Sequence, residues 1–136
     1  MSIEWAINNV LAGSARPGRY LGARVAVPEQ VVRDWIEAVR LQGISSIICL
    51  LDEEQLSLYR EHAGDLLALY GESGFHVTHE PVRDHLEPPL TDIQLGRVWA
   101  SFQALPTPVL IHCSAGIGRT RFAIAHIRQK LAESPG

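Results

Sequence analysis

The stretch from Val109 to Ile127, VLIHCSAGIGRTRFAIAHI, constrains the fold more than any other part of this 136-residue chain. A short aliphatic run ends in a histidine and a cysteine, and such a run predicts a buried β-strand. The glycines that follow predict a tight loop, and the pattern from about Arg119 to Glu133 predicts a helix. The stretch therefore predicts a strand–loop–helix unit that places Cys113 at the carboxyl end of the strand.

Strand and helix patterns alternate along the rest of the chain. Besides the strand at 108–113, strands are expected within 6–18 (one short strand closed by a turn at Pro17-Gly18), 44–51 and 75–82. Helices are expected over 28–43, 53–74 (in one or two pieces around Gly64) and 92–105, with Thr91 as an N-cap. This alternation predicts one α/β domain over 1–136 with a mostly parallel central sheet flanked by helices. Because ligands of such sheets bind beyond the carboxyl ends of the strands, Cys113 occupies an expected ligand position.

Composition and charge exclude several classes of protein. The net charge of −3 gives no bulk attraction for nucleic acid or an anionic membrane. Two cysteines do not make a disulfide framework, and no Cys/His spacing fits a zinc site. The N-terminus lacks a signal-peptide pattern, and no run approaches the ~20 apolar residues of a membrane span. We therefore expect a cytoplasmic protein, monomeric by default, without a metal or cofactor and without nucleic-acid or membrane partners.

The loop after the strand has the composition of an anion-binding site. A helix N-terminus presents free backbone N–H groups and a partial positive charge, and both favour a thiolate at Cys113. Gly116 and Gly118 allow the amides of 114–118 (Ser114, Ala115, Gly116, Ile117, Gly118) to turn inward as a nest. The guanidinium of Arg119 can hold two phosphate oxygens at once. The loop therefore predicts a cup that binds a phosphate monoester above a nucleophilic sulfur; the alternative is a structural cysteine before a tight turn.

Two neighbours of the cup have predicted supporting roles. The hydroxyl of Thr120 can donate to the sulfur and ease its departure in a second step. His112 is expected to hydrogen-bond the loop backbone and fix its shape, rather than to act as an acid or base.

The segment HCSAGIGRT resembles the signature loop of the cysteine-dependent protein tyrosine phosphatases, His-Cys-x5-Arg-Ser/Thr. Upstream, VLAGSARPG and ISSIICLLDEEQ resemble the first strand and the strand–acid segment of small dual-specificity phosphatases, and EPVRDHLEPPLTD is similar to their general-acid loop. The resemblance implies a two-step reaction without a metal. Cys113 attacks phosphorus to form a cysteinyl-phosphate, and an aspartic acid protonates the leaving oxygen and then activates water.

Asp84 is the predicted acid. It follows the strand in 75–82, whose end should lie near the cup, and it matches the family position. Asp92 is a rival that falls in the first turn of a helix, where acids are favoured for helix stability alone. Glu87 is a weaker rival, and His85 is interpreted as a solvent-facing residue.

The sequence departs from the family at Arg121, where glycine is usual after the threonine. This side chain is expected in solvent, with an extension of the positive rim as the alternative. Cys49 is interpreted as a core residue, with a disulfide to Cys113 as the alternative.

The loop residues 114–118 carry no basic side chain, whereas phosphoinositide-directed relatives tend to have one there. This favours a phosphorylated protein or peptide substrate, with phosphotyrosine preferred and phosphoserine or phosphothreonine as further substrates. Alternatives are a phosphatase for a non-protein phosphoester, a sulfurtransferase or arsenate reductase, and a phosphate-binding module without turnover.

Overall fold

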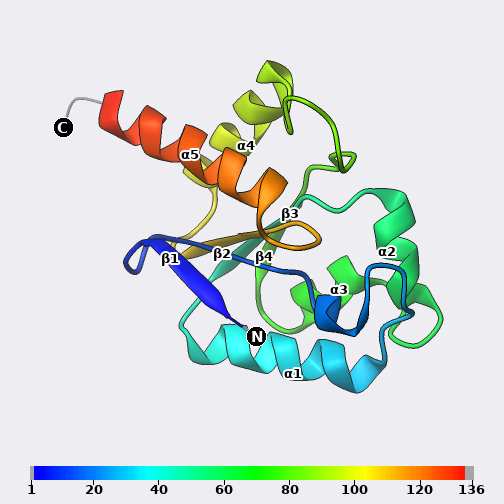
Figure 1. The fold of residues 1–136 in the computed structure, drawn as a ribbon. Helices are drawn as coiled ribbons and strands as arrows, with labels where there is room; N and C mark the ends of the chain where they lie inside the picture. Colours follow the sequence, from blue (N-terminus) through cyan, green and yellow to red (C-terminus); the bar gives the residue numbers. More distant parts are fainter. Residues whose placement is uncertain (1, 134–136) are drawn as a thin grey trace.

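A five-stranded sheet forms the centre of the computed structural model, which describes residues 2–133 (Figure 1). The spatial order is β1-β2-β5-β3-β4; β1 is antiparallel to β2, and the other neighbours are parallel. The strands are β1 (Ile3–Ile7), β2 (Leu11–Ser14), β3 (Ser46–Cys49), β4 (His76–His79) and β5 (Val109–His112). The predicted α/β class with a mostly parallel sheet is confirmed.

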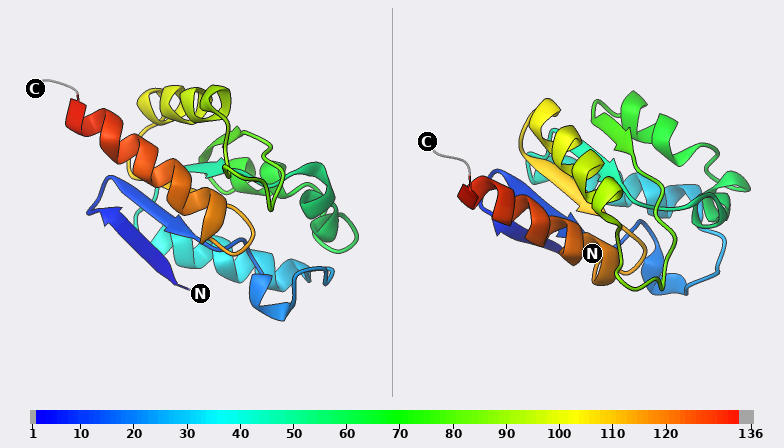
Figure 2. Two further views of the ribbon diagram at one scale, coloured as in Figure 1. Left: turned by 45° about the horizontal axis from the view of Figure 1, so that its top comes forward. Right: turned by 90° about the horizontal axis from the view of Figure 1, so that it is seen from above.

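Helices cover both faces of this sheet (Figure 2). The helices α1 (Glu29–Leu41), α2 (Glu53–Arg60) and α3 (Leu66–Glu72) lie on one side, and α4 (Asp92–Ala104) and α5 (Gly118–Glu133) lie on the other. A short 3-10 helix, η1 (Arg19–Leu21), follows β2. Each face of the sheet buries its own apolar cluster, one around Trp35 and Tyr70 and one around Val98 and Ile127.

Local capping chemistry explains where the helices begin. The Asp52 and Asp65 side chains accept hydrogen bonds from backbone N–H groups of the first turns of α2 and α3. Thr91 and Gln94 form a reciprocal capping box at the start of α4, as expected from Thr91 as an N-cap. The two-piece reading of 53–74 is correct, since α2 and α3 are separated at Gly64, which has φ +83°.

The N-terminal segment was predicted in part. The short strand expected within 6–18 is β2, with a turn at Pro17-Gly18, but β2 is the second strand of a hairpin whose first strand, β1, was not predicted. Asn9 adopts φ 60° in the turn, and the Val10 N–H donates to the Ile7 carbonyl at 3.0 Å. β1 was missed because its five residues carry no clean alternation and lie at the sheet edge, where one side is half-exposed.

The carboxyl ends of the four parallel strands lie in register. Ser14 of β2 pairs with His112 of β5, His112 with Cys49 of β3, and Cys49 with His79 of β4. This edge is where ligands of such sheets bind, and the next residue after β5 is Cys113. No helix within residues 2–133 is both long and apolar enough to cross a membrane.

Candidate active site

The signature loop, residues 112–120, runs from the last residue of β5 through the connection 113–117 into the first turn of α5, and it forms the floor of a cavity of about 580 Å³. Cys113 lines this cavity although the residue is only 2% exposed. Ser114, Ala115 and Gly118 line it from the same loop. The position expected for the nucleophile therefore opens onto a cavity and is not sealed in the core, which speaks against a purely structural cysteine.

Arg119 is held at the first turn of α5 by one end of its guanidinium. Its Nη1 donates to the Leu50 carbonyl (3.2 Å), the Val82 carbonyl (2.6 Å) and Gln55 Oε1 (3.0 Å). The residue is 2% exposed, and its Nε and Nη2 make no hydrogen bond. Nε and Nη2 form one edge of the guanidinium fork, the edge that binds two oxygens of one anion side by side. The structure thus anchors Arg119 through Nη1, while on its bidentate edge Nε has no partner and Nη2 is ion-paired with Asp84.

Asp84 lies in the same cavity as Cys113 and faces Arg119. Its Oδ2 is 3.2 Å from Arg119 Nη2 and accepts from Gln55 Nε2 at 3.3 Å, and its Oδ1 accepts from the His85 N–H at 3.0 Å. The Asp84 side chain is 32% exposed, so solvent and a substrate can reach it. His85 is solvent-facing, as expected, although its backbone adopts φ 61°.

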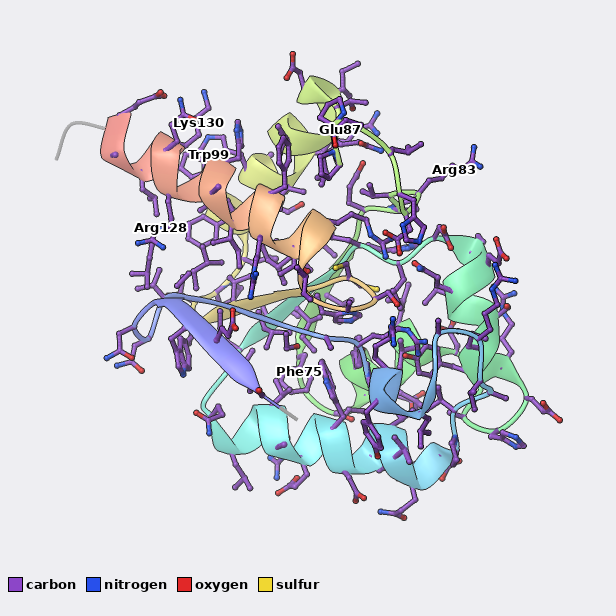
Figure 3. The ribbon with its side chains drawn as sticks, in the orientation of Figure 1. Phe75, Arg83, Glu87, Trp99, Arg128 and Lys130 are labelled. Atoms are coloured by element: carbon purple, nitrogen blue, oxygen red, sulfur yellow. The ribbon has the colours of Figure 1, made fainter. Side chains whose placement is uncertain are left out.

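The rival acids do not reach the cavity. Asp92 is exposed in the first turn of α4, and Glu87 is exposed on the loop that leads to that helix (Figure 3). Neither lines the cavity beside Cys113, and Asp84 does.

Gln55 was not recognised as a site residue from the sequence. Its amide donates to Asp84 and accepts from Arg119, so one side chain links the candidate acid to the candidate anion-binding group. Its position in the first turn of the helix that follows β3 could have identified it, because that turn lies at the ligand-binding edge of the sheet.

His112 is fully buried, and its two ring nitrogens have fixed roles. Nδ1 lies 3.1 Å from the Cys113 carbonyl, which can only accept, so Nδ1 carries the proton. Nε2 lies 2.9 Å from the Tyr70 hydroxyl and therefore accepts from it. Burial lowers the pKa of His112 from 6.5 to about 4, so the ring is neutral at pH 7. The ring contacts the backbone of the loop, as expected for a residue that shapes it.

Arg16 is a second residue that sequence analysis missed. It is 1% exposed, and its Nε donates to Ser114 Oγ (3.2 Å) while its Nη1 donates to the Tyr59 hydroxyl (3.0 Å). Its backbone N–H also donates to the Ser114 carbonyl (3.0 Å). No carboxylate among residues 2–133 is ion-paired with it, so its charge adds to the positive potential under the loop.

Gly116 allows the loop to rest on the end of β2. It has φ +78°, and a Cβ there would lie 2.6 Å from backbone atoms of Ser14 and Ala15. Gly118 begins α5, and its surroundings would leave room for a side chain. The Thr120 hydroxyl is buried and makes no hydrogen bond in this structure, so its donation to the sulfur stays a prediction.

Arg121 and Cys49, whose roles the sequence left open, take no part in the candidate site. Arg121 is exposed, lies 3.5 Å from Glu4 and lines a separate groove together with Arg128. The side chain of Arg128 extends from α5 toward the β1–β2 hairpin (Figure 3). Arg121 therefore does not extend the rim of the cup.

Cys49 is a free thiol with no exposed surface, and burial raises its pKa to about 12, as suits a core residue. No group of metal-ligating side chains occurs within residues 2–133.

The fold and the loop define a phosphatase of the dual-specificity and protein tyrosine phosphatase type, so the resemblance seen in the sequence is confirmed. The chain belongs to the family described as polymorphic toxin system, DSP-PTPase phosphatase, whose profile matches residues 21–130. No curated protein matched the chain in sequence.

Solved structures share the fold at low sequence identity. Kinase associated phosphatase, with its catalytic-site cysteine replaced by serine, is 23% identical with a TM-score of 0.74 over 100% of this chain and 77% of that one. A putative phosphatase (DUF442) from Shewanella putrefaciens CN-32 is 16% identical, with a TM-score of 0.69 over 98% and 74%. Tk-PTP in the active form is 20% identical, with a TM-score of 0.62 over 95% and 84%.

Proposed function

We propose that this protein hydrolyses phosphate monoesters through a cysteinyl-phosphate intermediate, with residues 1–136 acting as one catalytic domain. The observation that carries the proposal is that Cys113 and Asp84 line one cavity, and that Asp84 Oδ2 lies 3.2 Å from Nη2 of the buried Arg119. The Nε and Nη2 of Arg119 are buried and held by the bonds of Nη1, so a dianionic phosphoryl group that displaces Asp84 from Nη2 would meet a pre-organised pair of donors.

In the first step the Cys113 thiolate attacks phosphorus and a sulfur–phosphorus bond forms. The bond from phosphorus to the leaving oxygen breaks, and the protonated Asp84 carboxyl gives its proton to that oxygen, which departs as an alcohol. The loop amides, the start of α5 and the buried Arg16 favour both the thiolate and the transferring phosphoryl group.

In the second step the Asp84 carboxylate takes a proton from water while the water oxygen attacks phosphorus. The sulfur–phosphorus bond breaks, inorganic phosphate forms, and the sulfur leaves as a thiolate. Asp84 ends protonated, so the cycle closes without a metal, a redox partner or a net change in the protein. Thr120 is the proposed hydrogen-bond donor to the departing sulfur.

The proposed substrate is a phosphorylated protein or peptide, with phosphotyrosine preferred. The side chains of 114–118 carry no charge, so the loop adds no cation for a substrate with several phosphates. The free thiols at Cys49 and Cys113 suit a reducing compartment, and we propose that the protein acts in the cytoplasm.

The test is hydrolysis of p-nitrophenyl phosphate in the presence of EDTA. Wild type is expected to turn over, Cys113→Ser to be inactive, and Asp84→Asn to lose about 10²-fold or more in kcat. Matched controls are Cys49→Ser and Asp92→Asn, which change the same residue types outside the cavity and are expected to keep activity. Activity that survives Cys113→Ser would refute the mechanism, and an unaffected Asp84→Asn would move the acid elsewhere.

Substrate class needs a separate measurement. Phosphotyrosine, phosphoserine and phosphothreonine peptides of one sequence, together with a phosphoinositide and a sugar phosphate, are compared by kcat/KM. The proposal expects the phosphotyrosine peptide to be the best substrate. A higher kcat/KM for the phosphoinositide or the sugar phosphate would replace the protein substrate by a non-protein phosphoester.

A further inference from the structure

A second cavity, of about 590 Å³, adjoins the one above Cys113. Ala115 of the signature loop and Arg19 of η1 line both cavities. The second cavity differs in character because apolar side chains make most of its lining. We call these side chains the apolar shelf: Tyr20, Val31, Trp35, Ala38 and Ile117.

The shelf exposes large apolar side chains beside the site. Tyr20 is 76% exposed and Ile117 is 56% exposed, while Trp35 forms the buried floor. A contiguous exposed apolar patch rimmed by polar residues is typical of a binding surface. Here the rim carries Arg19 and Asp34.

The position of Tyr20 is fixed by the fold. Gly18 and Gly22, with φ +75° and +138°, bracket the 3-10 helix that carries it. Gly18 packs so closely that a Cβ would lie 2.6 Å from Val27 Cγ1. The Arg16 Nη2 donates to the carbonyls of Gly22 and of the residue after it, at 3.3 and 3.2 Å. The Arg16 guanidinium thus anchors this turn and also holds the signature loop through Ser114, so the shelf is pre-organised relative to the cup.

We propose that the apolar shelf binds an apolar side chain of the phosphorylated substrate, one or two positions from the phosphorylated residue. This rests on the proposed function, because the phosphoryl group must occupy the cup. The two cavities share lining residues Ala115 and Arg19, and one or two extended residues span about 3.5–7 Å. A leucine, methionine or phenylalanine there would cover Tyr20 and Ile117, which otherwise face water.

The experiment compares kcat/KM for matched phosphotyrosine peptides that carry leucine or serine at each flanking position. Wild type is expected to prefer leucine about tenfold at one position, since that is the scale of burying much of one aliphatic side chain. Tyr20→Ser removes the exposed wall and Ala38→Glu places a charge in the shelf, so both are expected to reduce the preference to about twofold or less. Leu41→Ser is the matched control: Leu41 is also 76% exposed but lies on α1 outside the cavity.

Three results would overturn the inference. One is equal turnover of the leucine and serine peptides by wild type, and another is a leucine preference that survives both Tyr20→Ser and Ala38→Glu. The third is a wild-type dimer, seen by light scattering, that Tyr20→Ser converts to monomers, since the shelf would then be covered by a second copy. p-Nitrophenyl phosphate has no flanking residue and reports on the cup alone. Loss of the peptide preference with p-nitrophenyl phosphate turnover intact therefore separates failure of the shelf from failure of the proposed function.

Discussion

The buried His112 predicts how the stability of the protein depends on pH. In the folded protein burial lowers its pKa to about 4, while in the unfolded chain it returns to 6.5. Between these values the unfolded state binds a proton that the folded state does not, so the free energy of unfolding falls as the pH falls. At pH 5 the linkage relation gives a loss of about 2 kcal/mol relative to neutral pH, growing to about 3 kcal/mol below pH 4.

Urea unfolding of wild type and His112→Asn at pH 7 and pH 5 measures this contribution. Asparagine keeps one donor and one acceptor but does not titrate, so the variant is expected to lose about 2 kcal/mol less than wild type between the two pH values. Groups other than His112 contribute equally to both proteins, and the comparison removes them.

A second measurement on the wild type needs no variant. The chain has six histidines. In an NMR titration of their Cε1–H signals, one signal, from His112, is expected to keep the chemical shift of a neutral ring at pH 5. Six histidines that all titrate between pH 6 and 7, or the same pH dependence of unfolding in both proteins, would refute the reasoning.

Three further predictions concern the site. Gly116→Ala is expected to abolish phosphatase activity and to lower the melting temperature, because φ +78° and a Cβ at 2.6 Å from neighbouring backbone leave no room for a side chain. Activity and thermal unfolding are measured on the same sample, and a fully active variant would contradict this prediction. Gln55→Ala is expected to lower kcat about tenfold, ~1.4 kcal/mol, because Asp84 loses the amide that orients it. Gln55→Glu keeps the shape of the side chain and adds a negative charge, so it tests which of the two matters. Unchanged kcat in Gln55→Ala would show that the hydrogen bond between Gln55 and Asp84 is only structural. Iodoacetamide is expected to label Cys113 and to leave Cys49 unmodified until the protein is unfolded, as peptide mass spectrometry would show; early labelling of Cys49 would contradict its burial.

The signature loop and its place in the fold could be predicted from the sequence because they depend on local patterns. An aliphatic run, two glycines and a helix pattern within 109–127 define the strand, the turn and the helix with little help from the rest of the chain. Parallel strands share one ligand-binding edge, so chain order, together with the match to the family's acid position, placed Asp84 near Cys113. The strand β1 escaped prediction because pairing with β2, rather than its own pattern, makes it a strand.

Tertiary contacts between distant segments decided the rest. Gln55 meets Arg119 across 64 positions of sequence, and Arg16 meets Ser114 across 98. No spacing rule predicts such pairs, because they arise only when β2, β3 and β5 lie side by side. The same is true of the apolar shelf, whose side chains come from η1, α1 and the signature loop. Local sequence therefore determined which residues can do chemistry, while long-range packing decided how Arg119 is held and what surface lies beside the cup.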